Sequence, residues 1–157
     1  MFNVGFTDLL LVWLAAVLIV AAVIDVRTFT ISNRLNLTVA LGAPLYWLSI
    51  ALVPWPGVAV QLVAAGIVFL LLAGAFYAGM MGGGDVKLAS ALALWFSPGG
   101  TIKLLVLMSL AGGVLTLGIV AWHRAKRREG RPEIPYGVAI AFGALAILTQ
   151  RFLNQFV

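Results

Sequence analysis

Long apolar runs recur along the whole chain, and they limit its fold more than any other sequence feature. Most of them are close to the 20 residues that a helix needs to cross the hydrocarbon core of a bilayer, about 30 Å thick. Hydrophobic residues make up 63% of the chain and charged residues 10%, whereas soluble domains carry about 25% charged residues. The sequence therefore predicts an integral membrane protein, organised as one domain over residues 1–157.

Prolines, glycines and polar turns divide the apolar runs into six expected transmembrane helices. They are expected at residues 5–24, 36–53, 58–81, 85–96, 101–122 and 136–156. The fourth run differs from the others, because its 12 residues make about 18 Å of helix, short of a full span by roughly 12 Å. Short connections favour antiparallel neighbours, so the expected fold is an all-α bundle of six transmembrane helices.

Two expectations concern packing between these helices. Small residues are dense in the third and fifth runs, for example at Ala64–Gly66 and Ala111–Gly113, and such residues allow helices to approach closely. Gln61 is a polar residue within an apolar run. We expect it to make a buried hydrogen bond to a neighbouring helix.

The basic residues gather on one side of this topology. Lys103 and Arg151 lie towards the other side, near helix ends from which they can extend to the headgroups. The remaining eight of the ten are Arg27, Arg34, Lys87, Arg124, Lys126, Arg127, Arg128 and Arg131. The positive-inside rule places that side in the cytoplasm and both termini outside, so we expect a multi-pass membrane protein. The basic residues that give the chain its net charge of +5 are then explained by its orientation in the membrane. Membrane lipid is an expected partner and nucleic acid is not.

Two of the five acidic residues stand at the edges of apolar runs. Asp85 follows Gly82, Gly83 and Gly84 and opens the fourth run, and Asp25 closes the first. An ionisable group at a membrane edge is a candidate functional residue. Each acid also has a structural interpretation: Asp85 as a helix cap after a glycine turn, and Asp25 as a charged helix end near two arginines. The topology places both at the cytoplasmic edge, which favours a functional pair.

A pair of carboxylates in a partly dry site can hydrolyse an amide. Close like charges do not both ionise cheaply, so the pair holds one proton; the ionised acid activates water and the protonated acid donates to the scissile group. The glycines before Asp85 would let an extended substrate approach the backbone. Asn33 is expected to cap the second helix, with a role in orienting Asp25 as the alternative. Lys87 is about 200° around the helix from Asp85, so we expect it to reach the lipid headgroups.

Metal and cofactor chemistry is not indicated. The chain has no cysteine, and its single histidine, His123, lies in a basic run. Thiolate sites and disulfides are therefore excluded, and we expect no metal and no cofactor.

Three ordered motifs resemble those of the type IV prepilin peptidases, which are intramembrane aspartic peptidases with a Gly-x-Gly-Asp motif. They are Asp25 followed by Ile31-Ser32-Asn33, then Gly82 to Leu88, then Pro135 to Ile140. The resemblance covers nearly the whole chain. It implies that Asp25 and Asp85 are the catalytic pair. It also implies that the substrate is a prepilin, cut on the cytoplasmic side after a basic leader ending in Gly.

The chain departs from the family pattern in two loops and in its length. The family usually has Pro where Ser32 stands and often has Pro where Val138 stands. Larger members carry an additional N-terminal domain with paired cysteines that accompanies methylation of the trimmed pilin. This chain begins at an apolar run and has no cysteine. It therefore resembles the short, peptidase-only form of tight-adherence (Flp-type) pilus systems, which is expected to trim without methylating.

Two other functions were weighed. A small transport or assembly subunit could use Asp25 and Asp85 as proton or cation sites, but it predicts an acid near mid-span and an internal repeat, and the sequence has neither. A presenilin-like peptidase that acts on other substrates is the second alternative. Only the resemblance of the motifs to those of prepilin peptidases distinguishes it from prepilin cleavage. The sequence indicates no oligomeric state.

Overall fold

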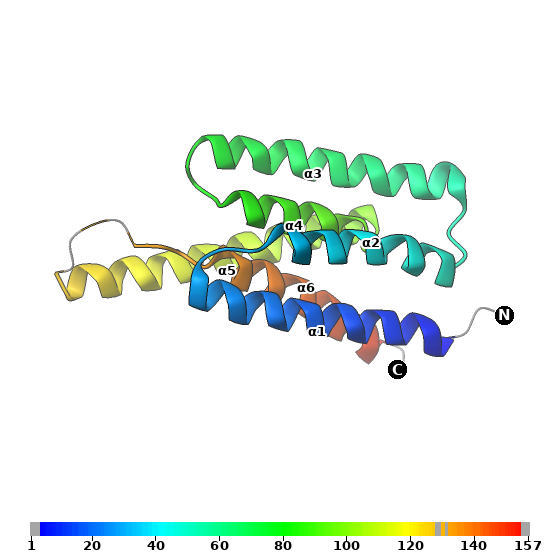
Figure 1. Cartoon of the computed structure of the whole chain (residues 1–157), viewed down its shortest axis with the longest axis horizontal. Helices are drawn as coiled ribbons and strands as arrows, with labels where there is room; N and C mark the ends of the chain where they lie inside the picture. The colour runs from blue at the N-terminus through cyan, green and yellow to red at the C-terminus, as the bar shows by residue number, and fades with distance from the viewer. Residues whose placement is uncertain (1–3, 128–129, 131, 155–157) are drawn as a thin grey trace.

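The computed structural model describes residues 4–127, 130 and 132–154, and it shows α-helices lying side by side along one long axis (Figure 1). No strand occurs among these residues, which confirms the all-α expectation. The elements are α1 (Val4–Thr28), α2 (Asn33–Ser49), the short turn η1 (Pro54–Val58), α3 (Ala59–Tyr77), α4 (Gly83–Ala93), α5 (Pro98–Ala125) and α6 (Tyr136–Leu153).

Four stretches are long and apolar enough to cross a membrane, as expected of a multi-pass membrane protein. They are Gly5–Thr28, Pro54–Tyr77, Pro98–Ala125 and Tyr136–Leu153. The other two helices are shorter, at 17 residues for α2 and 11 for α4. By length alone, therefore, α1, α3, α5 and α6 are spans, while α2 and α4 need a separate argument.

The two ends of the bundle carry different parts of the chain (Figure 1). The connections 29–32 and 78–82 lie at one end together with residues 132–135, and we call this the site end. The first turn of α1 and the last turn of α6 lie together at the opposite end, which we call the terminal end. The longest helix, α5, extends past the other helices at the site end.

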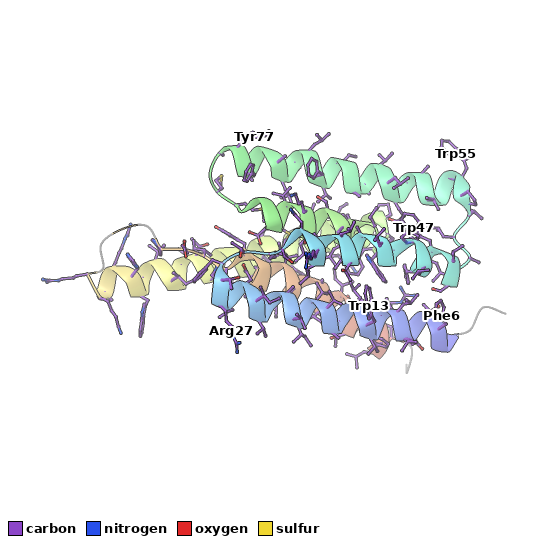
Figure 2. All side chains as sticks on the ribbon, in the orientation of Figure 1. Phe6, Trp13, Arg27, Trp47, Trp55 and Tyr77 are labelled. Carbon is purple, nitrogen blue, oxygen red and sulfur yellow. The ribbon has the colours of Figure 1, made fainter. Side chains whose placement is uncertain are left out.

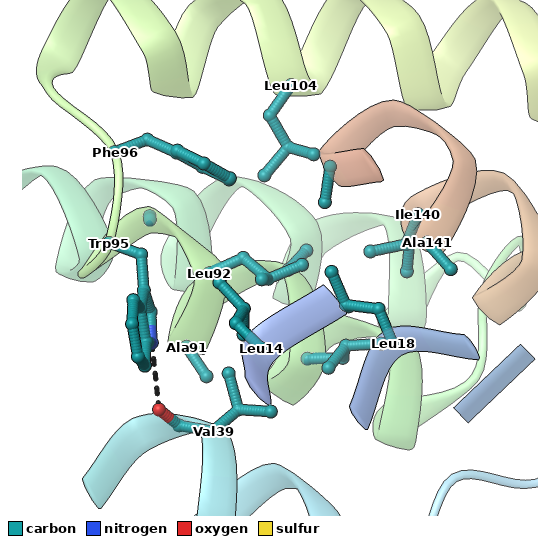
Figure 3. Packing of buried hydrophobic residues seen from close by; sticks show 14 of the residues in the cluster. Leu14, Leu18, Val39, Ala91, Leu92, Trp95, Phe96, Leu104, Ile140 and Ala141 are labelled. Atoms are coloured by element: carbon teal, nitrogen blue, oxygen red, sulfur yellow. Dashed lines mark hydrogen bonds between the residues drawn. The ribbon is translucent and has the colours of Figure 1, made fainter. Parts of the chain in front are cut away.

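The short helix α4 lies in the core of the bundle. Leu88, Ala89, Leu92 and Ala93 on this helix are fully buried. They belong to one hydrophobic cluster with residues of α1, α2, α5 and α6 (Figure 3). Trp95, just after α4, donates its indole N–H to the Val39 carbonyl at 2.9 Å. Because other helices surround α4, it need not match the thickness of the bilayer.

Large apolar side chains cover the outside of the bundle (Figure 2). Such an apolar surface suits contact with lipid tails rather than water. Trp55 and Tyr77, near the two ends of α3, are 82% and 86% exposed. Aromatic residues in these places are typical of the two membrane–water interfaces.

Two packing expectations need correction. Of the glycines in the apolar runs of α3 and α5, Gly112 does contact another helix, through Tyr136, but a Cβ added at Gly66, Gly74 or Gly113 would meet nothing within 4 Å. Among these glycines, only Gly112 therefore lies at a close contact with another helix. Gln61 is buried, as expected, but its Oε1 has no hydrogen-bond partner among the described residues. The expected interhelical bond to this oxygen was therefore wrong.

Candidate active site

Asp85 lies in the first turn of α4, where one of its carboxylate oxygens accepts a hydrogen bond and the other does not. Gly82 is the N-cap, and its backbone N–H donates to Asp85 Oδ2 at 3.2 Å. Oδ1 is buried and has no partner among the described residues. Asp85 is therefore not the N-cap of α4 but its third residue, and its bond to the N-cap amide occupies only one oxygen. The other remains available for chemistry.

Asp25 lies in the last turn of α1, because the helix continues four residues beyond the expected end at residue 24. The Phe29 N–H donates to the Asp25 carbonyl at 2.8 Å, and the helix stops where Phe29 adopts a φ of 50°. The Asp25 side chain is buried, and its Oδ2 has no hydrogen-bond partner within the part of the chain that the structure describes. By contrast, the arginines of the structural interpretation, Arg27 and Arg34, are exposed.

The fold brings the two carboxylates together at the site end. Asp25 comes from α1 and Asp85 from α4, and they are close enough for the charge of Asp25 to act on Asp85. The backbone amides of Gly137 and Val138, at the start of α6, lie within reach of the Asp25 carboxylate. The pair is therefore built from three separate segments of the chain.

Ile31, in the connection between α1 and α2, is the residue around which these segments pack. A Cβ added at Gly84 would lie 2.7 Å from the Ile31 carbonyl oxygen. A Cβ added at Gly137 would lie 2.6 Å from Ile31 Cδ1 and 2.8 Å from Asp25 Oδ2. Carbon atoms in contact are normally about 3.5–4.0 Å apart. Only glycine allows this approach, which gives Gly84 and Gly137 a packing role that spacing alone did not indicate.

The three glycines before Asp85 occupy different environments. Gly83 and Gly84 form the first turn of α4, so they are helical residues rather than part of an irregular loop. A Cβ at Gly83 would meet only the Phe76 ring, at an ordinary 3.4 Å, whereas one at Gly82 would lie 2.9 Å from Asp85 Oδ2. Within the Gly-x-Gly-Asp pattern, the variable position is thus the one with room for a side chain.

Asn33 differs from expectation and is bonded to Lys87. The N-cap of α2 is Ser32, whose Oγ accepts from the Leu35 N–H at 3.3 Å, so the expected cap at Asn33 was wrong. Asn33 Oδ1 instead accepts from Lys87 Nζ at 2.8 Å. Lys87 is therefore bonded to α2 while its side chain stays exposed, and its extension to the headgroups stays a prediction.

Asn36 is a site-end residue that the sequence analysis missed. It is buried in α2, and its Nδ2 donates to the Gly84 carbonyl at 3.0 Å, while Oδ1 has no partner. It therefore ties α2 to the first turn of α4, directly before Asp85. Its sequence signal was a polar residue on an apolar helix, one turn after Asn33.

Asp85 opens into a cleft at the site end, which we call the Asp85 cleft. It measures about 430 Å³, and its lining includes Phe29, Met80, Gly82, Glu133 and Tyr136. Glu133 lies in the connection between α5 and α6 and forms part of the wall of this cleft, and Glu129 lies outside the described residues. A peptide segment could reach Asp85 through the cleft.

The arrangement suits acid–base chemistry on a bound peptide. Each carboxylate has a buried oxygen without a partner, and groups of this kind could accept or donate a proton at a bound water. Among the residues that the structure describes, no three His, Asp or Glu side chains gather in a way that could hold a metal ion.

Comparison with known proteins identifies the family. The model of the type IV leader peptidase family matches residues 12–117, more than half of the chain. The matched stretch contains Asp25, Asn33 and Asp85 and ends before Gly137. No curated protein and no solved structure matches the chain. With this match beside the paired carboxylates, the chain belongs to the type IV leader peptidase family and is a membrane peptidase.

Proposed function

We propose that the chain removes the basic leader peptide from Flp-type prepilins at the cytoplasmic face of a bacterial inner membrane. Asp25 and Asp85 act as the catalytic pair. The observation that carries this proposal is that two buried carboxylates, from α1 and α4, lie at the same end of the bundle within range of each other's charge. Each has one oxygen without a hydrogen-bond partner among the described residues. Family membership supports the reaction class.

The proposed reaction needs one water and one proton held by the pair. The ionised aspartate takes a proton from the water, and the resulting hydroxide attacks the scissile carbonyl while the protonated aspartate donates to its oxygen. Collapse of the tetrahedral intermediate breaks the C–N bond, and the leaving amine receives a proton from the pair. The Gly82 N–H bond to Asp85 Oδ2 would hold that carboxylate in a fixed orientation during these steps.

The proposed topology has six crossings with both termini outside. In this arrangement α2 and α4 also pass through the membrane, and the burial of α4 among longer helices makes its short length acceptable. The site end then faces the cytoplasm, in agreement with its excess of basic residues.

Cysteine labelling tests this topology cleanly, because the chain has no cysteine of its own. Thr30 is exposed at the site end and Gly99 is exposed at the terminal end. A membrane-impermeant maleimide should label Gly99→Cys in intact spheroplasts and Thr30→Cys only after lysis. Labelling of Thr30→Cys in intact spheroplasts would reverse the proposed orientation.

Co-expression with an Flp-type prepilin tests the activity. The expected result is a leader-sized shift on a gel, with the new N-terminus directly after the glycine that ends the leader. A membrane-inserted, folded protein that leaves every tested prepilin uncut would overturn the substrate proposal. Cleavage of other transmembrane peptides by the same preparation would then favour the presenilin-like alternative.

A further inference from the structure

A second pocket lies at the terminal end of the bundle, opposite the carboxylate pair. It measures about 610 Å³ and is formed by the ends of α2 and α6, the start of α3 and the start of α5. We call it the Gln61 pocket. Side chains that line it include Tyr46, Gln61, Trp95, Lys103 and Arg151. None of these residues belongs to the Asp85 cleft, so the pocket needs a separate explanation.

The charge of the Gln61 pocket is positive. Lys103 and Arg151 both line it, and none of its described lining residues is acidic. Asp8, an acid of α1 near this end, is not part of the lining. Arg151 donates to the Tyr46 hydroxyl and lies over the Tyr46 ring, 5.5 Å from its centre. These contacts hold the guanidinium at the pocket, and they involve no carboxylate that would neutralise it.

The start of α5 adds to this positive character. Ser97 caps this 28-residue helix, and Gly99 and Gly100 in its first turn also line the pocket. The N-terminus of a long helix carries a partial positive charge and backbone N–H groups that favour anions.

Gln61 supplies an independent indication of a ligand. Its side chain is only 7% exposed, it lines the pocket, and its Oε1 has no hydrogen-bond partner among the described residues. A buried side-chain amide normally has hydrogen-bond partners. An amide oxygen that finds no donor in the protein is therefore a candidate to bond a ligand or a water. Rotation of the terminal amide presents either its oxygen or its two N–H donors to the pocket.

The aromatic residues around this end indicate its depth in the membrane. Trp55, at the terminal end, is 82% exposed, whereas Tyr77 lies exposed at the other end of α3 (Figure 2). Tryptophan favours the headgroup level of a bilayer. The Gln61 pocket therefore opens where phosphate groups of lipids are most concentrated.

We propose that the Gln61 pocket binds the phosphate of a phospholipid headgroup. Lys103 and Arg151 contact the phosphate oxygens, and the Gln61 amide bonds a polar group of the same headgroup. Inorganic phosphate offers the same chemistry without the acyl chains. The competing explanation is that both cations simply extend to the interface without binding a particular molecule.

The test measures lipid binding directly, so its outcome does not depend on peptidase activity. The full-length protein is purified in detergent and titrated with short-chain phosphatidylglycerol, with diacylglycerol of the same chains, and with inorganic phosphate. Native mass spectrometry reports the bound fraction at each concentration. The variants are Lys103→Gln and Gln61→Leu, with Lys126→Gln at the site end as the matched loss of one positive charge.

The expected result is saturable binding of one phosphatidylglycerol, weakened at least about tenfold by Lys103→Gln, because charge-assisted hydrogen bonds are the stronger class. Gln61→Leu should weaken binding several-fold, and Lys126→Gln should leave it unchanged. Because Lys103 is exposed, its replacement should not affect folding, and a thermal melt checks this. If inorganic phosphate competes with the lipid, the phosphate group alone suffices for binding. If it does not compete, the acyl chains also contribute to binding. The proposal would be overturned if diacylglycerol bound as tightly as phosphatidylglycerol. It would also be overturned if Lys103→Gln bound phosphatidylglycerol as tightly as the wild type.

Discussion

Replacement of Gly84 by alanine should damage both stability and cleavage, since the position has no room for a methyl group. The added Cβ would lie 2.7 Å from the Ile31 carbonyl oxygen and 3.2 Å from both Ile31 N and Cβ. Two of these three atoms belong to the backbone, so no change of rotamer relieves the overlap. The first turn of α4 or the connection 29–32 must move instead. Overpacking of this kind costs about 1–3 kcal/mol.

The same displacement acts on catalysis, because Asp85 is the next residue. A shift of about 1 Å in a reacting group can cost about 100-fold in rate. We therefore expect Gly84→Ala to cut prepilin roughly 10–100-fold more slowly than the wild type. Its thermal midpoint in detergent should also fall.

Gly83→Ala is the matched control, one residue away in the same helical turn. Its Cβ would meet only the Phe76 ring at 3.4 Å, and alanine in a helix is favoured over glycine by about 0.5–1 kcal/mol. This variant should melt at or above the wild-type temperature and cut at a similar rate. Both proteins are compared by thermal unfolding in one detergent and by a cleavage time course. If Gly84→Ala matched Gly83→Ala in both assays, the packing of Gly84 on Ile31 would not be needed for the site.

Three further predictions concern one packing contact and two hydrogen bonds. Gly42→Ala should lower stability by about 1–3 kcal/mol, because its Cβ would lie 2.6 Å from the Trp95 ring. Gly118→Ala is the control and should leave stability unchanged, because its Cβ would meet nothing within 4 Å. Equal melting temperatures of the two variants would contradict this prediction. Trp95→Phe removes the indole bond to the Val39 carbonyl and should cost about 1 kcal/mol, measured by thermal unfolding. An unchanged midpoint would count against it. Asn36→Leu removes the bond to the Gly84 carbonyl, worth about 1 kcal/mol. It should slow prepilin cleavage severalfold, and an unaltered rate would show that this bond does not position Asp85.

Local sequence patterns predicted the helices well, because the formation of each helix depends on residues that are close together in the sequence. Apolar runs, the prolines and the glycine turn placed every helix, and charge placed Asp25 and Asp85 at one end. Errors arose at helix ends, where a side chain decides the boundary. Ser32 rather than Asn33 caps α2, and α1 continues through Asp25 to Thr28.

Contacts between distant segments were not predictable from the sequence. The approach of Gly84 and Gly137 to Ile31 joins the connection 29–32 to the first turns of α4 and α6. No local pattern indicates which of the 17 glycines takes part. Asn36 bonds a carbonyl 48 residues away. The Gln61 amide illustrates the opposite error: a polar residue in an apolar run suggested a partner inside the protein, and the structure gives its oxygen none.

Prepilin cleavage by Asp25→Asn, by Asp85→Asn and by the double variant tests the proposed catalytic pair most directly. Asparagine keeps the shape of each side chain but cannot exchange the proton. Asp8→Asn, far from the site at the terminal end, is the control and should stay active. Removal of one of two crowded carboxylates relieves repulsion, so all variants should still fold and bind prepilin. Each single change should abolish cleavage almost completely and the double change should be little worse, because residues that act as a unit are not additive. Cleavage at a near-normal rate by either single variant would contradict the aspartic mechanism.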